Sequence, residues 1–353
     1  MDIKRSIIDM GAEYLERRGI ENARQESGWL FEHVFGKTDP LFASDGEQLE
    51  QTARLVSVKN TKRYNELLER RVYGEPLQYL LGEWEFYGLR MNVGEGVLIP
   101  RPETEFLVEL GIDYIKSTDI KEPLVIDLCA GTGCVAIAMA KIAGCRAVAL
   151  ELSERAIDYA NKNIKLNNVP DKVRVYKGDI FDEGLVSKMP MLDCIFANPP
   201  YLSKKDMQSL QKEVTREPTL ALYGGEDGLD FYRKIFKMWR SKLKPGGLFA
   251  VEVGDGQAGM VSGFMSEAGM EPDSMKDYSG IDRVVYTKYS CTKDYEAELR
   301  SLLQEKELLL LEAERREKTH NPPVQKTTIN GKSAKKPEKK KGLFSFFKNF
   351  KKK

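Results

Sequence analysis

Histidine is scarce in this chain of 353 residues. Only His33 and His320 occur, and neither lies near a recognisable motif. The five cysteines include no Cys-x-x-Cys pair. Histidines and paired thiols supply many of the metal ligands and catalytic bases of proteins. The sequence therefore predicts no metal site and no mechanism that depends on a histidine base.

Apolar runs are also short. No run approaches the roughly 20 residues that a membrane-spanning helix needs. The N-terminus is charged from Asp2 and Lys4 onward, so we expect no signal peptide. The cysteines lie mostly in apolar contexts and are expected to be free thiols in a reducing, cytoplasmic setting. They are Cys129, Cys134, Cys145, Cys194 and Cys291.

Charge is distributed unevenly along the chain. Residues 332–353 carry ten lysines and one glutamate, a net charge of +9, whereas the whole chain carries +1. Residues 1–331 are therefore acidic, at −8. An enzyme that modifies duplex DNA is expected to present a basic face to the phosphates. The acidic body favours a protein substrate.

The most informative motif is Asn198-Pro199-Pro200-Tyr201, which follows the apolar run 192–197. That run is typical of a buried strand that opens into a loop. Two prolines stiffen the loop and leave carbonyl groups free to accept hydrogen bonds. Asn198 adds a side-chain acceptor and Tyr201 an aromatic face. Such a loop suits a planar NH2 group, either a glutamine amide or the exocyclic amine of adenine.

A second motif is the glycine-rich turn Gly131-Thr132-Gly133, which follows the apolar segment 124–128. A helical pattern continues from it to about Ala143. Glycines at such a turn let the backbone approach a ligand closely, as in nucleotide-binding α/β folds. No Gly-Lys-Ser/Thr ending follows, which argues against a phosphate-binding P-loop.

Two further segments end in acidic residues. The predicted strand 147–150 ends at Glu151, whose carboxylate could accept both hydroxyls of a ribose. The predicted strand 173–176 leads to Asp179 and Ile180, which could bind an adenine amine and cover its ring. With Asn198 ending a fourth strand, these residues predict a ligand site outside the carboxyl ends of a doubly wound sheet.

These motifs resemble those of the HemK/PrmC family, the protein-(glutamine-N5) methyltransferases that modify peptide-chain release factors. The resemblance covers about residues 1–290 and is weak over the first seventy. The resemblance includes the stretch Leu98–Glu105. Within it, the segment Pro-Arg-Pro-Glu-Thr-Glu (residues 100–105) separates this family from DNA methyltransferases that share Asn-Pro-Pro-Tyr. Further matching segments are Gly74–Leu80, Asp127–Gly133, Glu217-Pro218, Gly225–Leu229 and Asp277–Arg283.

The resemblance implies a class I Rossmann-like, S-adenosylmethionine-dependent methyltransferase domain. Its substrate would be the glutamine of the Gly-Gly-Gln motif in class 1 release factors. Asn198 and the Pro199 backbone would receive the substrate amide beside the cofactor, with Pro200 and Tyr201 shaping that pocket. The residues that would line S-adenosylmethionine are Cys129, Ala130, Gly131, Thr132, Gly133, Glu151, Asp179, Ile180 and Asn198.

The chain departs from the family pattern at two of these positions. Cys129 stands where many relatives have glycine, and Glu151 replaces the commoner aspartate. Gly131 and Gly133 remain, and a glutamate also accepts two hydrogen bonds. The longer side chain of Glu151 would place its carboxylate differently toward the ribose than an aspartate would.

The residue patterns, and the turn-forming residues that interrupt them, predict that the chain has four parts. Residues 1–71 read as a small helical bundle, which in the family recognises the release factor. Residues 72–100 read as a hairpin-like linker, and 101–290 as the catalytic domain. Within that domain we expect a helix over 153–166, capped by Ser153, and strands over 248–253 and 284–289.

The last part, residues 291–353, lies outside the family pattern. It reads as a charged helix over 293–318, a polar linker and a short basic segment. In that last segment one helical face would carry Leu343, Phe346, Phe347 and Phe350. Such a face suits an anionic membrane surface or ribosomal RNA. The alternative is a solvated tail whose aromatic residues dock on the protein itself.

Two other functions share some of these features. An adenine-N6 nucleic-acid methyltransferase would use the same Asn-Pro-Pro-Tyr motif, and the basic tail would suit it. The acidic body and the segment Leu98–Glu105 count against that hypothesis. A non-catalytic binding module could keep the pocket as a scaffold, but the intact glycine turn, Glu151 and Asn198 argue against it.

Overall fold

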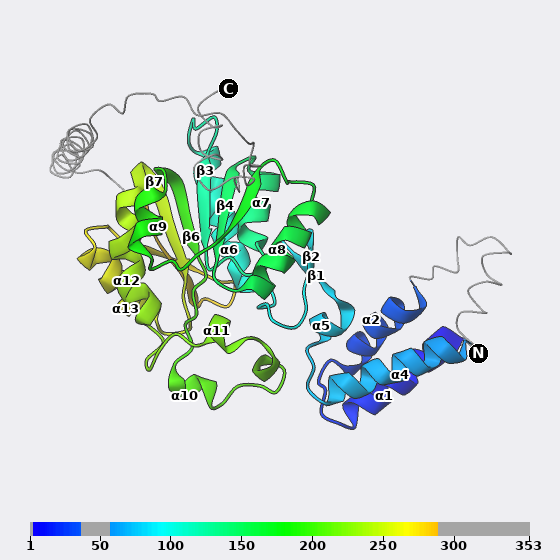
Figure 1. Cartoon of the computed structure of the whole chain (residues 1–353). Helices are drawn as coiled ribbons and strands as arrows, with labels where there is room; N and C mark the ends of the chain where they lie inside the picture. The colour runs from blue at the N-terminus through cyan, green and yellow to red at the C-terminus, as the bar shows by residue number, and fades with distance from the viewer. Residues whose placement is uncertain (1–2, 37–56, 289–353) are drawn as a thin grey trace, which may run out of the picture. The chain divides into compact units, whose positions relative to one another are not determined.

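A computed structural model describes residues 3–36 and 57–288 (Figure 1). The helices are α1 (Ile3–Glu16), α2 (Ala23–Phe35), α4 (Val58–Val72), α5 (Leu77–Leu81), α6 (Glu105–Lys116), α7 (Cys134–Ile142), α8 (Glu154–Leu166), α9 (Glu183–Lys188), α10 (Lys204–Met207), α11 (Thr219–Leu222), α12 (Asp230–Trp239) and α13 (Ala258–Glu267). Three short 3-10 helices are η1 (Pro102–Thr104), η2 (Val214–Arg216) and η3 (Arg240–Lys242).

The strands form a hairpin and a seven-stranded sheet. They are β1 (Glu83–Phe86), β2 (Leu89–Asn92), β3 (Leu124–Leu128), β4 (Arg146–Glu151), β5 (Val173–Lys177), β6 (Leu192–Ala197), β7 (Leu243–Glu252), β8 (Asp273–Lys276) and β9 (Asp282–Lys288). The sheet order is β5-β4-β3-β6-β7-β9-β8, and β9 alone runs in the direction opposite to the other six strands. The predicted α/β fold with a doubly wound, mostly parallel sheet is confirmed.

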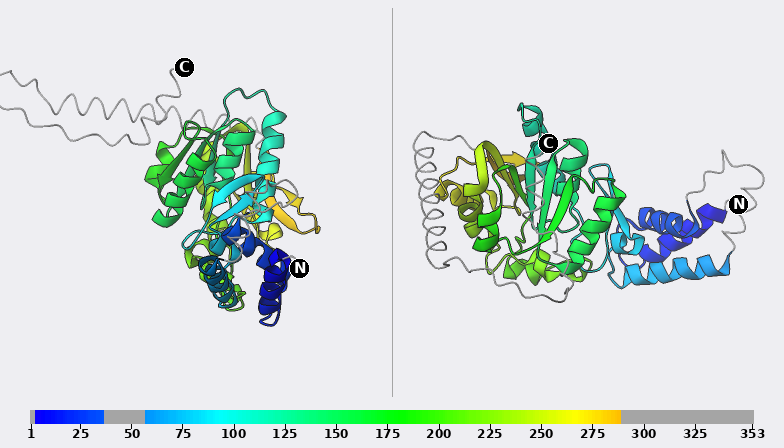
Figure 2. Two further views of the ribbon diagram at one scale, coloured as in Figure 1. Left: turned by 90° about the vertical axis from the view of Figure 1, so that its right-hand side faces the viewer. Right: turned by 45° about the horizontal axis from the view of Figure 1, so that its top comes forward.

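The order of the strands places a ligand site. From β3 the chain adds strands outward through β4 and β5, then returns to the other side of β3 with β6. Ligands of open α/β sheets bind at such a switch point, outside the carboxyl ends of the strands. Helices α6, α7 and α8 cover one face of the sheet, and α9, α12 and α13 cover the other (Figures 1 and 2).

Burial on both faces explains why the central strands are almost continuously apolar. Every residue of β6 is buried, and so are most of β3 and β4. The predicted helix after β4 begins where expected, because the Ser153 hydroxyl accepts a hydrogen bond from the Ala156 backbone N–H at 3.4 Å. The strands predicted over 248–253 and 284–289 correspond to β7 and β9.

The hairpin predicted within 72–100 is formed by β1 and β2. Its two-residue turn, Tyr87 and Gly88, has positive φ at both positions (50° and 72°), as tight hairpins favour. Met91 is fully buried in the same apolar core as the large sheet. Asn163 of α8 accepts the Asn92 backbone N–H at 2.6 Å and donates to the Asn92 carbonyl at 3.1 Å. The hairpin therefore packs as part of the catalytic core.

The N-terminal helices have an apolar core of their own. Leu30 and Phe31 of α2 are buried against Tyr64 and Leu67 of α4. The Ser27 and Tyr64 hydroxyls are hydrogen-bonded inside this core at 2.6 Å. The helical character predicted for residues 1–71 is thus confirmed for the part of that segment that the structure describes, and the boundaries at 71 and 100 stay predictions.

The described residues, 3–36 and 57–288, belong to one compact unit. The helix predicted over 293–318 and the basic apolar face of Leu343, Phe346, Phe347 and Phe350 lie outside the described residues. None of the helices in 3–36 and 57–288 is both long enough and apolar enough to cross a membrane.

Candidate active site

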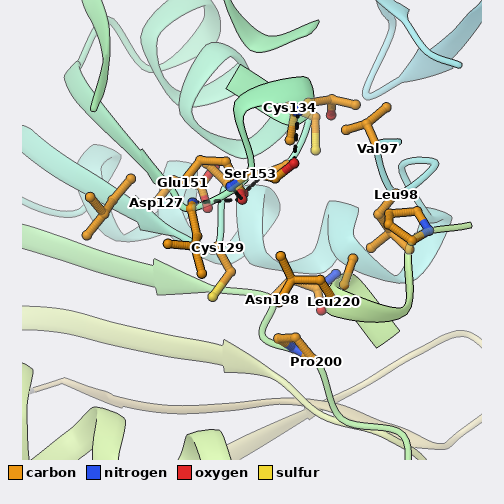
Figure 3. Close-up of a pocket in the computed structure, with 18 of the residues that line it drawn as sticks. Val97, Leu98, Asp127, Cys129, Cys134, Glu151, Ser153, Asn198, Pro200 and Leu220 are labelled. Atoms are coloured by element: carbon orange, nitrogen blue, oxygen red, sulfur yellow. Dashed lines mark hydrogen bonds between the residues drawn. The ribbon is translucent and has the colours of Figure 1, made fainter. Parts of the chain in front are cut away.

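A cavity that is partly open to solvent lies at the carboxyl ends of β3, β4, β5 and β6. In Figure 3, Asn198 and Pro200 lie on one side of it, opposite Glu151 and Ser153. The residues predicted for the site that line this cavity are Cys129, Ala130, Gly131, Thr132, Glu151, Asp179, Ile180, Asn198 and Pro200. Gly133, Pro199 and Tyr201 are next to lining residues in the chain but are not part of the lining themselves.

The glycine turn approaches the cavity through left-handed backbone. The φ angles of Cys129, Gly131 and Gly133 are 60°, 54° and 76°. A Cβ atom added to Gly131 would meet nothing within 4 Å, so its backbone faces open space. Gly133 is the N-cap residue of α7. Two of the three positions thus use the residue type that adopts this backbone at no steric cost.

Cys129 is the exception, because a side chain in this region of φ is strained. The conformation explains why a glycine suits the position. Burial raises the pKa of the Cys129 thiol well above its ordinary value, and the nearby carboxylates of Glu151 and Asp127 raise it further. The thiol is therefore neutral at physiological pH and is not a nucleophile.

Glu151 anchors the glycine turn to the end of β4. One carboxylate oxygen accepts the Gly131 backbone N–H at 2.8 Å, and the other accepts the N–H groups of Leu152 and Ser153, each at 2.8 Å. Each carboxylate oxygen has two lone pairs, so one lone pair of Oε2 remains for a ligand in this arrangement. The predicted pair of ribose contacts would require Glu151 to release a backbone partner.

Asp179 and Ile180 form another part of the wall, after β5. Asp179 is exposed, and its Oδ1 accepts the Phe181 backbone N–H at 2.8 Å. Ile180 is buried, and its carbonyl accepts the indole N–H of Trp239 at 2.9 Å. This hydrogen bond holds the backbone of Ile180 in place, and Ile180 lines the cavity. Next to it, the Oδ2 atom of Asp179 could accept a hydrogen bond from a ligand.

Asp127 is a buried carboxyl group that sequence reasoning did not select. It is 2% exposed at the end of β3, and its Oδ2 accepts the Ala136 backbone N–H at 3.2 Å. Burial raises the pKa of Asp127 to about 8, with a further increase from Glu151 and a decrease from the Ala136 hydrogen bond. The carboxyl group is therefore mostly protonated at neutral pH.

The Asn198 corner is held by residues far away in sequence. Asn198 Nδ2 donates to Thr104 Oγ1 at 3.0 Å, and Thr104 Oγ1 donates to Glu252 Oε2 at 2.6 Å. Thr104 precedes α6, Asn198 follows β6, and Glu252 ends β7. The NH2 end of the Asn198 amide is thus engaged, which leaves its carbonyl end for a ligand.

Glu252 is 1% exposed, and its environment determines its charge. Burial raises its pKa to about 7, and the charge of Glu103 adds to the increase. Hydrogen bonds from Thr104 and Tyr201 and the charge of Arg283 lower its pKa.

Across residues 3–36 and 57–288, no group of three or more His, Cys, Asp or Glu side chains could hold a metal ion.

Tyr201 supports the corner from behind. Its hydroxyl lies 3.4 Å from Glu252 Oε1, and its carbonyl accepts the side-chain amide of Gln257 at 2.9 Å. Burial, followed by the charge of Glu252, raises the pKa of the Tyr201 phenol, which stays protonated. Its aromatic ring is therefore placed to brace the loop, not to form the cavity wall.

An ion pair beside the cavity joins two of the segments that identify the family. The Arg101 guanidinium pairs with Glu217, and Glu217 also accepts the Ile99 backbone N–H at 3.0 Å. The Glu217 side chain is only 2% exposed. The segments Leu98–Glu105 and Glu217-Pro218 are thus one structural unit, although they are more than a hundred residues apart in the chain.

Sequence reasoning missed Asp127, Thr104 and Glu252 as site residues. Thr104 lies inside the segment Leu98–Glu105, which identified the family but suggested no role for the threonine. Glu252 stood only as a residue of a predicted strand. A glutamate in an otherwise apolar strand was the available signal, because a buried carboxylate requires hydrogen-bonding partners.

Comparisons with known proteins match both parts of the chain. The family model of the PrmC N-terminal domain matches residues 6–82, and that of ribosomal protein L11 methyltransferase (PrmA) matches 108–199. A solved methyltransferase from Pyrococcus furiosus aligns over 58% of this chain and 91% of its own length, at 19% identity and a TM-score of 0.44.

Two curated relatives bear the same name. The release factor glutamine methyltransferase of Thermodesulfovibrio yellowstonii is 42% identical over 227 residues, which are 64% of this chain and 80% of that protein. The enzyme of that name from Clostridium acetobutylicum is 34% identical over 288 residues, 81% of this chain and 98% of the relative. The chain therefore belongs to the release factor glutamine methyltransferase family.

Proposed function

We propose that this protein transfers a methyl group from S-adenosylmethionine to the side-chain nitrogen (N5) of a glutamine, in the Gly-Gly-Gln motif of a class 1 release factor. The observation that carries the proposal is the hydrogen bond from Asn198 Nδ2 to Thr104. It directs the carbonyl end of Asn198 to a ligand, and a carbonyl is the group that an NH2 requires.

The cavity has the features that S-adenosylmethionine needs. The backbone at Gly131 is open, as close approach by a ligand demands. Glu151 retains one acceptor position, and Asp179 lies beside the apolar side chain of Ile180. These residues would hold a ribose and an adenine respectively. Bound S-adenosylmethionine supplies an electrophilic methyl group on a sulfonium.

The protein's part in the reaction is to prepare a poor nucleophile. An amide nitrogen reacts weakly because its lone pair is delocalised into the carbonyl. Asn198 Oδ1 and the Pro199 carbonyl would each accept one N–H of the substrate amide, which orients the nitrogen and favours its electron-rich form. In well-oriented systems, alignment of this kind contributes about 7–11 kcal/mol.

These acceptors also stabilise positive charge as it develops on the nitrogen, in the way that an oxyanion hole stabilises negative charge. The amide proton then leaves once methylation has made the nitrogen acidic, so the transfer needs no base to begin. Asn198 and Pro199 thus orient the substrate nitrogen before the transfer and stabilise its developing positive charge during the transfer.

Recognition of the release factor would involve the N-terminal helices. A second, largely polar cleft lies between those helices and the catalytic core, and its lining includes Trp29, Trp84 and Glu213. The two tryptophan rings meet edge to face at 5.7 Å. Arg71 of α4 fixes this arrangement, because it donates to Glu26 of α2 at 2.6 Å and to Glu213 at 2.6 Å. A protein surface could contact both bodies there.

Transfer from tritiated S-adenosylmethionine tests the proposal. The acceptors are a class 1 release factor, the same factor with the glutamine of Gly-Gly-Gln changed to alanine, and duplex DNA. We expect label only in the unaltered factor. Label in DNA would replace the proposal with adenine methylation, and equal label in both factors would move the site to another residue.

A further inference from the structure

A carboxamide has two ends of nearly equal size and opposite hydrogen-bonding character. If Asn198 turned its NH2 end toward the substrate, two donors would face each other and the glutamine amide would be repelled. The function proposed above therefore requires something that sets the direction of the Asn198 amide.

Thr104 alone cannot set that direction, because a hydroxyl both donates and accepts. Its single hydrogen is, however, directed to Glu252 Oε2 at 2.6 Å, a length typical of a hydroxyl that donates to a carboxylate. Only lone pairs of Thr104 then remain for Asn198, which lies 3.0 Å away. Asn198 can therefore hydrogen-bond to Thr104 only by donating from its NH2 end.

Glu252 is held firmly enough to impose this polarity. Its carboxyl group is buried, and its second oxygen faces the Tyr201 hydroxyl at 3.4 Å. Its backbone carbonyl accepts the Tyr232 hydroxyl at 2.7 Å, and β7 is paired on both sides. The backbone of Glu252 is therefore fixed by the sheet, and each of its carboxylate oxygens has a hydrogen-bond partner.

We infer that Thr104 and Glu252 are positioning residues for the transfer: ionised Glu252 takes the only hydrogen of Thr104, which forces Asn198 to offer its carbonyl oxygen to the substrate amide. The inference rests on the proposed function. A protonated Glu252 donates to Thr104 instead. The Thr104 hydrogen is then free to reach Asn198, and the amide is free to turn.

The relay is therefore sensitive to pH near neutrality. Burial raises the pKa of Glu252 to about 7, so the ionised form prevails above that value and the neutral form below it. Arg283 favours the ionised form, and Glu103 favours the neutral one. The titratable and charged neighbours of the group are Glu103, Cys134, Tyr201, Tyr232 and Arg283.

The first test replaces the hydroxyl. Thr104→Val should lower kcat about ten- to hundredfold, somewhat less than the loss of a group that touches the substrate. Thr104→Ser keeps the hydroxyl and should restore most of the rate. The dissociation constant of S-adenosylmethionine should stay within about twofold, because Glu151 and the glycine turn are untouched. A purely structural role would move both quantities together.

Thr287→Val is the matched control. Thr287 is a buried threonine of β9 whose hydroxyl has no hydrogen-bond partner among the residues that the structure describes. Its replacement removes the same atoms and should leave kcat unchanged. If Thr104→Val were as active as Thr287→Val, the relay would be refuted even though the methyltransferase function stood.

The second test uses pH. The wild-type rate should rise as pH increases through about 7, as Glu252 becomes ionised. Glu252→Gln is neutral at every pH and should show a rate about tenfold lower without that rise. A retained rise in the glutamine variant would assign the titration to another group and overturn the role of Glu252.

A third measurement needs no methyl acceptor. The side-chain NH2 resonances of Asn198, assigned by their loss in Asn198→Ala, should shift with a midpoint near pH 7 in the wild type and not in Thr104→Val. If the chemical shifts of these resonances did not change with pH in the wild type, the inference would be overturned. If they shift while no release factor is methylated, the relay holds and the proposed substrate is wrong.

Discussion

The two sides of the cavity are built in different ways. On the cofactor side, the turn after β3 is held by Glu151, only twenty residues beyond Gly131. On the acceptor side, Asn198 depends on Thr104, 94 residues away, and Thr104 depends on Glu252, 148 residues away. Sequence motifs predict a site that is built from the ends of neighbouring strands. They predict only part of a site whose residues depend on partners far away in the chain.

The difference also separates backbone chemistry from side-chain chemistry. Gly131 and Glu151 shape a concave surface through backbone N–H groups, which tolerate some change of side chain. Asn198, Thr104 and Glu252 form a chain of hydrogen bonds in which each member sets the direction of the next. We therefore expect substitutions on the acceptor side to affect kcat and those on the cofactor side to affect binding.

The largest expected effect is that of Asn198→Ala. Loss of one preorganised polar group should lower kcat about 10²- to 10³-fold. The dissociation constant of S-adenosylmethionine, measured by calorimetry, should change much less. A kcat within threefold of wild type would remove Asn198 from the catalytic role and with it the distinction between the two sides.

Arg101→Met tests the ion pair between Arg101 and Glu217 beside the cavity. It leaves the nearly buried Glu217 without its cation, and we expect the free energy of unfolding to fall by about 2 kcal/mol in urea titrations. Arg90→Met is the matched control, because the Arg90–Glu83 pair is exposed and should contribute less than about 1 kcal/mol. Equal losses would show that burial of Glu217 is not what matters.

Cys129 tests the cofactor side. Cys129→Val places a β-branched side chain at a φ of 60° and should weaken S-adenosylmethionine binding about tenfold, since left-handed backbone costs about 1–2 kcal/mol. Cys129→Gly removes the strain and should bind within about twofold of wild type. A valine variant that binds normally would mean that the turn adjusts freely.

The last effect concerns the pH dependence of stability that Asp127 causes. The pKa of Asp127 in the folded protein, about 8, lies above the ordinary 3.8, so its contribution to stability is full below pH 4 and is lost as pH rises to about 8. Asp127→Asn lacks this dependence. The melting temperature of the variant relative to wild type should therefore rise between pH 5 and pH 8. A constant difference would contradict the raised pKa.

Most of the fold followed from local pattern. The apolar runs 124–128, 147–150, 173–176 and 192–197 became β3, β4, β5 and β6, and Ser153 capped the next helix. Burial on both faces of a parallel sheet makes such strands continuously apolar, which is why they are easy to recognise. The hairpin was predicted as a linker, and only packing showed that Met91 belongs to the catalytic core.

The site was predicted less evenly. Residues next to strand ends were identified, because the topology of an α/β sheet brings those ends together whatever else the chain does. Their partners were not. The three backbone N–H groups on the Glu151 carboxylate, and the support that Tyr201 gives from behind the cavity, depend on distances that no spacing in the sequence encodes.

The amino-acid sequence alone thus determined the strands, the turns, the family and the residue that would meet the substrate amide. Tertiary structure decided which way that residue faces. The reason is physical: a hydrogen bond has a direction, and the direction of the Asn198 amide is set by a hydroxyl and a buried carboxylate that only the packing of η1, β6 and β7 brings within 3.0 Å of one another.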